Sequence, residues 1–153
     1  MIKPKIISGG QTGVDQGALD FAIDYDFEHG GYCPKGRKCE AGVIPFKYHL
    51  TELESEEYTD RTRKNVLESD ATIIIHDDIP LKEGSLNSIK FCNQFNKPFL
   101  FINTDMKVED NKKFKSWMKE NNIKILNIAG NRSSDNPGIK SKTYLALIKL
   151  FGI

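Results

Sequence analysis

Runs of strand-forming residues alternate with helical patterns along the whole chain, and this alternation limits the fold more than any other feature. Four short runs rich in β-branched or aromatic residues have the length and continuity of strands buried on both faces. These runs are residues 5–8, 72–76, 98–102 and 125–128, and a weaker fifth candidate covers residues 28–32.

Apolar residues with helical spacing fill the intervals between these strands. Three segments show the pattern clearly, at residues 14–25, 114–118 and 144–151, and two less regular ones lie at residues 56–69 and 86–95. Such alternation favours parallel βαβ units with right-handed crossovers. We therefore predict an α/β fold, a three-layer α/β/α sandwich with a Rossmann-like, doubly wound, mostly parallel sheet.

Length and charge exclude several classes of protein. The 153 residues leave room for one domain, residues 1–153, and 22 Lys and Arg against 21 Asp and Glu give a net charge of +1. This balance disfavours nucleic-acid and membrane partners. No apolar run approaches the ~20 residues of a membrane span, and the first ten residues lack the apolar core of a signal peptide. Three cysteines without paired spacing suit a reducing compartment, so we expect a cytoplasmic protein.

The segment after the first predicted strand has the features of a phosphate cradle. Ligands of open parallel sheets bind beyond the carboxyl ends of the strands, and residues 8–15 (SGGQTGVD) leave such an end and open a helix. Glycines allow a close backbone approach, and the N–H groups of a first helical turn favour an anion. Gln11, Thr12 and Asp15 add side-chain donors and acceptors. The alternative is a tight turn in which Thr12 caps the helix.

Three further strand exits carry similar residues. Lys35 and Arg37 bring two cations to the exit of the second strand, unless this is only a solvated basic loop. A Gly84-Ser85 step opens a helix after the third strand, and Gly130 and Arg132 leave the last one. In the predicted fold these exits converge on one rim, so we expect a single anion site there.

Candidates for catalysis are sparser. His29, His49 and His76 stand alone in sequence, and a structural role is the commoner one for such residues. The cysteines lack metal-ligand spacing, which favours inert buried thiols. Asp77 and Asp78 could hold a cation or accept a hydrogen bond from a ribose, or could simply be solvated.

One irregular stretch, residues 33–53, is longer than the ~2 to 6 residues of an ordinary βα loop. It is therefore functional, or an excursion for assembly. If it serves assembly, we expect an apolar interface that includes Val43, Ile44, Phe46 and Tyr48.

Several motifs resemble a known family. They are residues 9–15 (GGQTGVD), 31–34 (GYCP), Tyr58, residues 61–66 (RTRKNV), 69–70, 126–130 (LNIAG) and Arg132. Together they resemble the putative molybdenum carrier family, a circularly permuted branch of the LOG-like (lysine-decarboxylase-like) Rossmann superfamily, over nearly the whole chain. The resemblance implies a homo-oligomeric protein that binds a small phosphate-bearing ligand, either the molybdenum cofactor (molybdopterin) or a nucleotide-like molecule.

The resemblance also implies ligand contacts. These fall on Gly10, Gln11, Thr12, Gly13, Asp15, Lys35, Arg61, Thr62, Asn65, Gly84, Ser85, Gly130 and Arg132. The chain departs from the family pattern twice, with Glu83-Gly84-Ser85 for the common Gly-Gly-Thr and Gly130-Asn131-Arg132 for Gly-Pro-Arg. Glu83 adds a negative charge beside the expected anion site.

Two functions follow from these observations. One is a carrier, store or sensor that binds its ligand without chemistry; the other is a nucleotide N-glycoside hydrolase like the phosphoribohydrolases of the superfamily. Those enzymes resemble one another in a PGGxGTxxE segment with an acid residue, whereas residues 85–104 here contain no Asp or Glu. This favours binding, although Asp15, Asp70 or Asp77 could supply a carboxylate. A third possibility is a vestigial pocket in an assembly partner.

Overall fold

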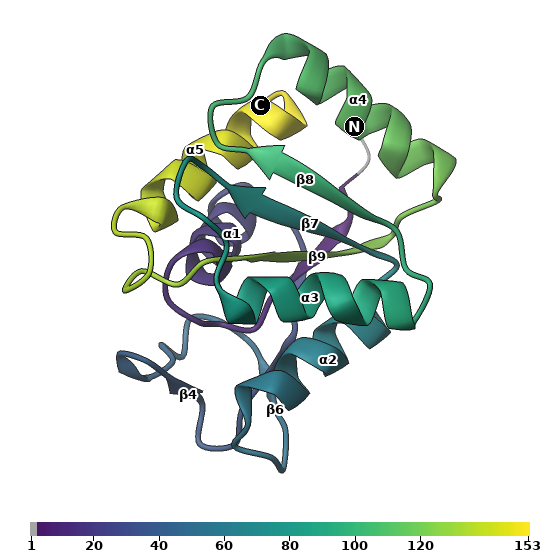
Figure 1. Cartoon of the computed structure of the whole chain (residues 1–153). Coiled ribbons are helices and arrows are strands. Elements are labelled where there is room, and N and C mark those ends of the chain that lie inside the picture. Colours follow the sequence, from purple (N-terminus) through teal and green to yellow (C-terminus); the bar gives the residue numbers. More distant parts are fainter. Residues whose placement is uncertain (1–2) are drawn as a thin grey trace.

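Five parallel strands form the central sheet of the computed structural model, which describes residues 3–153, in the order β2-β1-β9-β7-β8 (Figure 1). They are β1 (Lys5–Ile7), β2 (His29–Gly30), β7 (Ala71–His76), β8 (Phe99–Asn103) and β9 (Ile125–Gly130). All five coincide with runs that the sequence predicts as strands. The order reverses around β9, because β1 leads outward to β2 on one side and β7 to β8 on the other.

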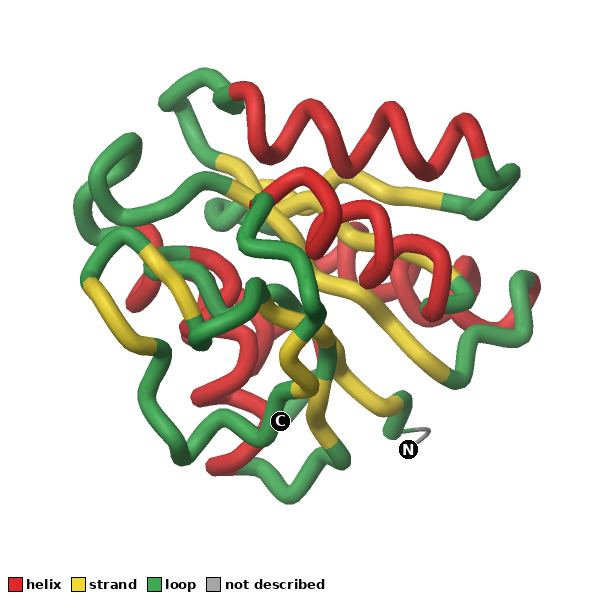
Figure 2. Tube along the Cα trace, turned by 90° about the horizontal axis from the view of Figure 1, so that it is seen from below, coloured by secondary structure: helices red, strands yellow, loops and turns green. Residues whose placement is uncertain are grey.

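Five helices cover the two faces of this sheet (Figure 2). They are α1 (Val14–Asp24), α2 (Tyr58–Glu68), α3 (Glu83–Gln94), α4 (Val108–Glu120) and α5 (Ile139–Phe151). α5 packs against both α1 and α4, while α2 packs against α3. The Rossmann-like α/β/α sandwich is therefore confirmed. No helix within residues 3–153 is both long enough and apolar enough to cross a bilayer.

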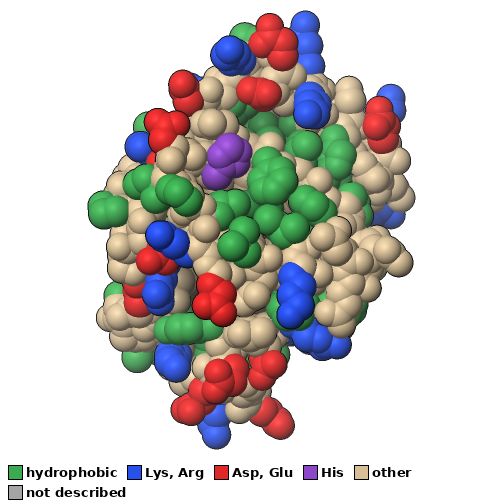
Figure 3. All heavy atoms as spheres, viewed as in Figure 1, with side chains coloured by type: hydrophobic (Ala, Val, Ile, Leu, Met, Phe, Trp, Pro, Cys, Tyr) green, Lys and Arg blue, Asp and Glu red, His purple; other side chains and the backbone are tan. Residues whose placement is uncertain are grey.

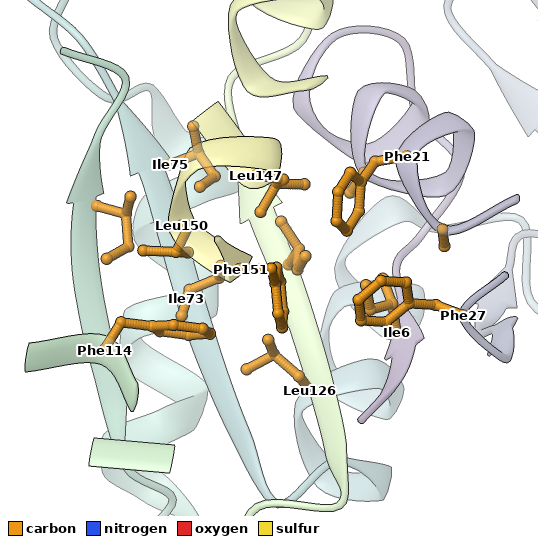
Figure 4. Packing of buried hydrophobic residues seen from close by; sticks show 14 of the residues in the cluster. Ile6, Phe21, Phe27, Ile73, Ile75, Phe114, Leu126, Leu147, Leu150 and Phe151 are labelled. Carbon is orange, nitrogen blue, oxygen red and sulfur yellow. The ribbon is translucent and has the colours of Figure 1, made fainter. Parts of the chain in front are cut away.

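Aromatic side chains form the centre of the main core, between the sheet and the helices α1, α4 and α5 (Figure 4). The ring of Phe151 lies 4.9 Å from that of Phe27, 5.1 Å from that of Phe114 and 5.5 Å from that of Phe21, measured between centroids. Burial of each phenyl group contributes about 1.5 to 3 kcal/mol. This cluster fixes α1 and α5 behind the strand exits.

The prediction of burial on both faces holds for β7 and is wrong for β8. Residues 71–75 of β7 are all buried, whereas Phe101 of β8 is 49% exposed. β8 is the edge of the sheet and pairs only with β7. The central strand β7 and the edge strand β8 both have continuous apolar sequences. They differ in how many strands flank them, which their composition does not show.

Residues 31–53 form an excursion with its own small core. Gly31, at φ 125°, separates β2 from β3 (Tyr32–Cys33), which pairs with β6 (Thr51–Glu52), while β4 (Lys38–Cys39) pairs with β5 (Gly42–Val43). Ile44 and Tyr48 are buried in this core. The expectation that they form an exposed interface is therefore wrong for these two residues. Val43 and Phe46 are exposed, at 61% and 75%.

Close approach of α1 to α5 depends on Gly17. A Cβ at this position would lie 2.5 Å from the carbonyl oxygen of Lys140 and 3.2 Å from Cβ of Thr143. We expect Gly17→Ala to lower the free energy of unfolding by about 1 to 3 kcal/mol through overpacking, despite the better helix propensity of alanine. Urea denaturation measures this change.

Gly84→Ala is the matched control, because Gly84 also lies in a helix and a Cβ there would have no neighbour within 4 Å. This variant should gain up to about 1 kcal/mol in the free energy of unfolding. Equal effects of the two substitutions would contradict the close packing of α1 and α5.

Candidate functional site

A cavity of about 560 Å³ opens at the carboxyl edge of the sheet, where the strand order reverses. Its walls come from the exits of β1 and β9 and from the first turns of α2 and α3. Ligands of open α/β sheets bind at such switch points. The cavity is therefore the candidate functional site.

Most residues that the sequence singles out line this cavity. Those that do are Gln11, Asp15, Arg61, Thr62, Asn65, Gly84, Ser85, Gly130 and Arg132. Gly10, Thr12, Gly13 and Lys35 are not among its lining residues. Several strand exits thus converge on one cavity, as expected, although four of the named residues do not line it.

The loop after β1 holds a carboxylate of the chain itself. Asp15 accepts hydrogen bonds from the backbone N–H groups of Gln11 (3.2 Å) and Gly9. The side-chain oxygen of Gln11 accepts from the N–H groups of Thr12 (3.1 Å) and Glu40 (2.9 Å). The backbone N–H groups that we expected to bind a phosphate thus largely donate to side chains of the protein itself. The glycine-rich sequence alone could not show this occupation.

Burial raises the pKa of Asp15 to about 6, against the opposing effects of Arg61 and of the two backbone N–H donors. Desolvation penalises the charged form of a carboxyl group, which explains the direction. Asp15 is therefore a carboxyl group that exchanges its proton near neutral pH, at the wall of the cavity.

Arg61 brings a buried guanidinium group to the same loop from α2. Its Nη1 donates to the carbonyl oxygen of Gly9 at 2.8 Å, and the side chain is only 7% exposed. A Cβ on residue 9 would lie 2.3 Å from Cδ of Arg61, so any larger residue here would displace the Arg61 side chain from its present position. Burial lowers the pKa of Arg61, and Asp15 opposes this effect.

No carboxylate of the described chain lies within ion-pair distance of Arg61. The remaining N–H groups of the guanidinium make no hydrogen bond within residues 3–153. The charge of Asp15 attracts Arg61 through space, and the guanidinium lies 5.2 Å from the centre of the Tyr58 ring, but no carboxylate pairs with it directly. A bound anion would supply that direct partner.

Asn65, one turn after Arg61 on α2, clamps the excursion to the sheet. Its Oδ1 accepts from the N–H of Tyr32 at 2.9 Å, and its Nδ2 donates to the carbonyl of Tyr32 at 3.0 Å. Arg61 and Asn65 are both buried and both line the cavity, so they lie on the same face of α2.

The two segments that depart from the family pattern, residues 83–85 and 130–132, contact each other. Oδ1 of Asn131 accepts from the N–H of Lys82 (2.9 Å) and from the hydroxyl of Ser85 (3.2 Å). Its Nδ2 donates to the carbonyl of Pro80 at 2.9 Å. The side chain of Asn131 thus ties the loop between β7 and α3 to the exit of β9. Sequence reasoning treated the two departures separately and did not expect this contact.

Thr12 and Arg132 belong to a second polar cluster beside the cavity. The Thr12 hydroxyl accepts from the N–H of Ser133 at 3.1 Å and donates to the Glu40 carboxylate. Nε of Arg132 lies 3.1 Å from Oδ2 of Asp135 and 3.6 Å from Oε1 of Glu40. Glu40, from the excursion, therefore joins the exits of β1 and β9.

Sequence reasoning missed two cations of the cavity and misplaced another. Lys38 and Lys82 line the cavity, and Lys82 could have been noticed because it directly precedes α3. Arg37 donates to three backbone carbonyls of the excursion, so placing it on the rim is wrong. The cavity also carries acids, namely Asp15, Glu57, Glu83 and Asp135. It is a mixed polar site, with Arg61 as its buried cation.

The other candidate carboxylates lie outside this cavity. Oδ2 of Asp70 accepts from the N–H groups of Lys124 (2.9 Å) and Ile125 (2.8 Å), next to the amino end of β9. Asp77 accepts from the N–H of Ile79 (2.9 Å) and from Nδ2 of Asn136 (2.8 Å). Both side chains hold loops together, which leaves Asp15 as the acid of interest.

The cysteines and histidines have structural surroundings. Cys33, Cys39 and Cys92 are buried and unbridged, and burial raises the pKa of the Cys33 thiol. The rings of His29 and His49 stack at 5.2 Å between centroids. Within residues 3–153, no group of three His, Cys, Asp or Glu side chains could hold a metal ion.

Comparison with known proteins places this fold and site in a family. A model described as the circularly permutated YpsA SLOG family matches residues 6–151. The chain belongs to this family. The match runs from the second residue of β1 to the end of α5, and therefore includes every residue that lines the cavity.

A solved structure from Syntrophus aciditrophicus SB, described as a "Putative molybdenum carrier protein", is similar to this YpsA-type SLOG chain. It is 42% identical, with a TM-score of 0.89, and the alignment covers 98% of this chain and 96% of that one. No curated protein matches the chain. The family resemblance that the sequence motifs indicate is thereby confirmed.

The raised pKa of Asp15 in this SLOG protein makes a prediction about stability. Unfolded Asp ionises near 3.8 and native Asp15 near 6, so the native state holds more protons between these values and stability falls as the pH rises. Asp15→Asn removes the charge, so we expect its free energy of unfolding at pH 7 to rise by up to about 3 kcal/mol, with little change below pH 4. Urea denaturation across pH 3.5 to 7.5, run beside wild type, tests this.

Asp20→Asn, on the same helix, is the control with opposite sign. Burial opposes ionisation of Asp20, but hydrogen bonds from Tyr48 and Lys47 outweigh it and lower the pKa. This variant should lose stability at pH 7. A loss at pH 7 in Asp15→Asn as well would show that the charged form of Asp15 stabilises the fold.

Proposed function

We propose that the protein is a binding protein that holds a small phosphate-bearing ligand, a pterin or a nucleotide-like molecule, in the cavity at the carboxyl edge of the sheet. The observation that carries this proposal is the buried guanidinium of Arg61, which has no carboxylate partner in the described chain. A carrier or store needs a group that attracts its ligand, and Arg61 supports this role because its guanidinium is buried at the wall of the cavity.

Charge favours an anion as the ligand. Arg61 reaches the carbonyl of Gly9 with Nη1, and the planar group has further donors that suit the paired oxygens of a phosphate. Lys82 adds a cation at the start of α3 that makes no ion pair within residues 3–153. Protonation of Asp15 near pH 6 would further reduce the negative charge of the wall.

Size and polarity favour a heterocycle in addition to the phosphate. A volume of about 560 Å³ falls within the range of about 300 to 1,000 Å³ that small-molecule sites occupy. Side-chain amides and hydroxyls of Gln11, Asn87 and Ser88 line the same cavity. Such groups can donate to and accept from the edge of a pterin or a purine.

The molybdenum cofactor fits these residues as cargo. The amide groups suit its pterin, and Arg61 and Lys82 suit its phosphate. The similar protein from S. aciditrophicus is described as a "Putative molybdenum carrier protein", which supports the same ligand here. In this proposal the chain binds and shields the cofactor, and a homo-oligomer presents several such cavities.

Nucleotide N-glycoside hydrolysis is the second candidate, and Asp15 is the observation that favours it. A carboxyl group with a pKa of about 6 at the wall of a cavity can donate or accept a proton near neutral pH. Asp15 lies on α1, whereas the phosphoribohydrolases carry their acid in the segment that corresponds to residues 85–104, where this sequence has none. Asp15 would protonate the leaving base or activate water.

A binding titration tests the carrier proposal. With guanosine monophosphate and guanosine as probes, we expect the phosphate-bearing probe to bind at least about tenfold more tightly, as a charge-assisted hydrogen bond provides. Lys82→Ala should weaken binding of the monophosphate by about tenfold. Calorimetry measures both affinities.

Lys35→Ala is the matched control, since Lys35 is an exposed lysine that does not line the cavity. Its affinity for the monophosphate should equal that of wild type. Equal affinities for the two probes, or equal losses of affinity in the two lysine variants, would show that the phosphate does not bind in this cavity.

Release of free base separates the two candidate functions. If the protein is a carrier, guanosine monophosphate incubated with it stays intact, as chromatography of the mixture would show. Sustained release of guanine by wild type, lost in Asp15→Asn while the probe still binds, would instead establish the hydrolase. Release that survives in Asp15→Asn would point to a contaminating activity.

A further inference from the structure

The outer edge of β8 offers unpaired backbone groups. β8 ends the sheet, and the N–H of Thr104, just beyond it, donates to the carbonyl of His76 at 2.9 Å. Backbone groups alternate between the two sides of a strand, so even-numbered residues of β8 face β7. The N–H and C=O groups of Phe99, Phe101 and Asn103 therefore point away from the sheet. No hydrogen bond within residues 3–153 joins these outward groups to another element.

The two edges of the sheet are protected differently. β2, at the opposite edge, has only two residues and ends at Gly31, whose φ of 125° turns the chain away. β8 is five residues long, with the sequence FLFIN, and contains neither a charge nor a proline. Native proteins commonly guard exposed edges with short strands, charges, prolines or bulges. The unguarded edge of β8 is therefore suited to pairing.

An apolar patch lies beside this edge. Phe101 is 49% exposed, Ile79 36% and Leu86 50%, and hydrophobic side chains gather over β7 and β8 in the space-filling view (Figure 3). A hollow of about 280 Å³, lined by Ile79 and Phe101 among others, lies in the same region. Clustered apolar surface of this kind marks interaction sites.

The sequence around β8 is complementary to itself in one antiparallel register. With a two-fold axis at Phe101, Phe101 faces Phe101 of a second copy, and Phe99 faces Asn103 of that copy. All of these residues have outward backbone groups, as an antiparallel ladder requires. The same register places Lys97 opposite Asp105 of the second copy, and the symmetry repeats this pair of opposite charges at the other end.

We propose that a second copy of this chain pairs with β8 in this register and joins the two sheets into one. Three outward residues in each copy supply one donor each, so the ladder contains six hydrogen bonds. The facing Phe101 rings form a cross-strand aromatic pair. Lys97 Nζ donates to the carbonyl of Ser69, on the β7 side of β8, at 2.9 Å. In the dimer it exchanges this contact for the carboxylate of Asp105 of the second copy.

Sedimentation velocity tests this proposal. Wild type should sediment with the mass of two chains, and Phe101→Glu should raise the dissociation constant of the dimer at least about tenfold, because two carboxylates then face each other. Leu145→Glu is the control, since Leu145 is 57% exposed on α5, away from the edge, and its substitution should not change the dimer. Circular dichroism checks that each variant is folded.

A charge exchange tests the register. Lys97→Glu and Asp105→Lys should each weaken the dimer, and the double variant should recover most of the affinity because opposite charges face each other again. A monomeric wild type, a dimer that Phe101→Glu leaves intact, or a double variant no tighter than the single ones would overturn the proposal. So would a β8 edge that pairs only with a strand of a different protein.

Discussion

The contact between Arg61 and the backbone of Gly9 is the constraint on which the site depends. It fixes α2 over the exit of β1 and brings a guanidinium to a place that water reaches poorly. The absence of a side chain at residue 9 leaves room for the present position of Arg61, because a Cβ would overlap its Cδ. A turn of the helix later, Asn65 attaches the excursion to the same scaffold. Positioning and charge thus come from one helix face.

Much of the fold could be predicted because the physical signals are local. The Ile-rich run of β7 and the helical spacing of α1 and α5 report burial directly, and strand-helix alternation determines the layers. Exposure of β8 could not be predicted in this way. Whether Phe101 meets another strand or solvent depends on the order of strands in space, which no local pattern encodes.

The same limit applies to the site. Gly9 and Arg61 contact each other across 52 positions of sequence, and only the family motif drew attention to Arg61. Lys35 and Lys38 lie three residues apart in the excursion, yet only Lys38 lines the cavity, and only the folded path of this segment shows which of the two does so. The glycine-rich loop was recognisable, whereas its occupation by the carboxylate of Asp15 follows from geometry alone.

The contact of Asn131 with Ser85 and with the backbone of residues 80 and 82 limits which residues can replace it. A proline at position 131, common in the resembling family, has no side-chain amide, so two part-buried backbone groups would need other partners. Neighbouring positions are therefore epistatic, and a homologue cannot exchange this single residue without rebuilding one side of the rim.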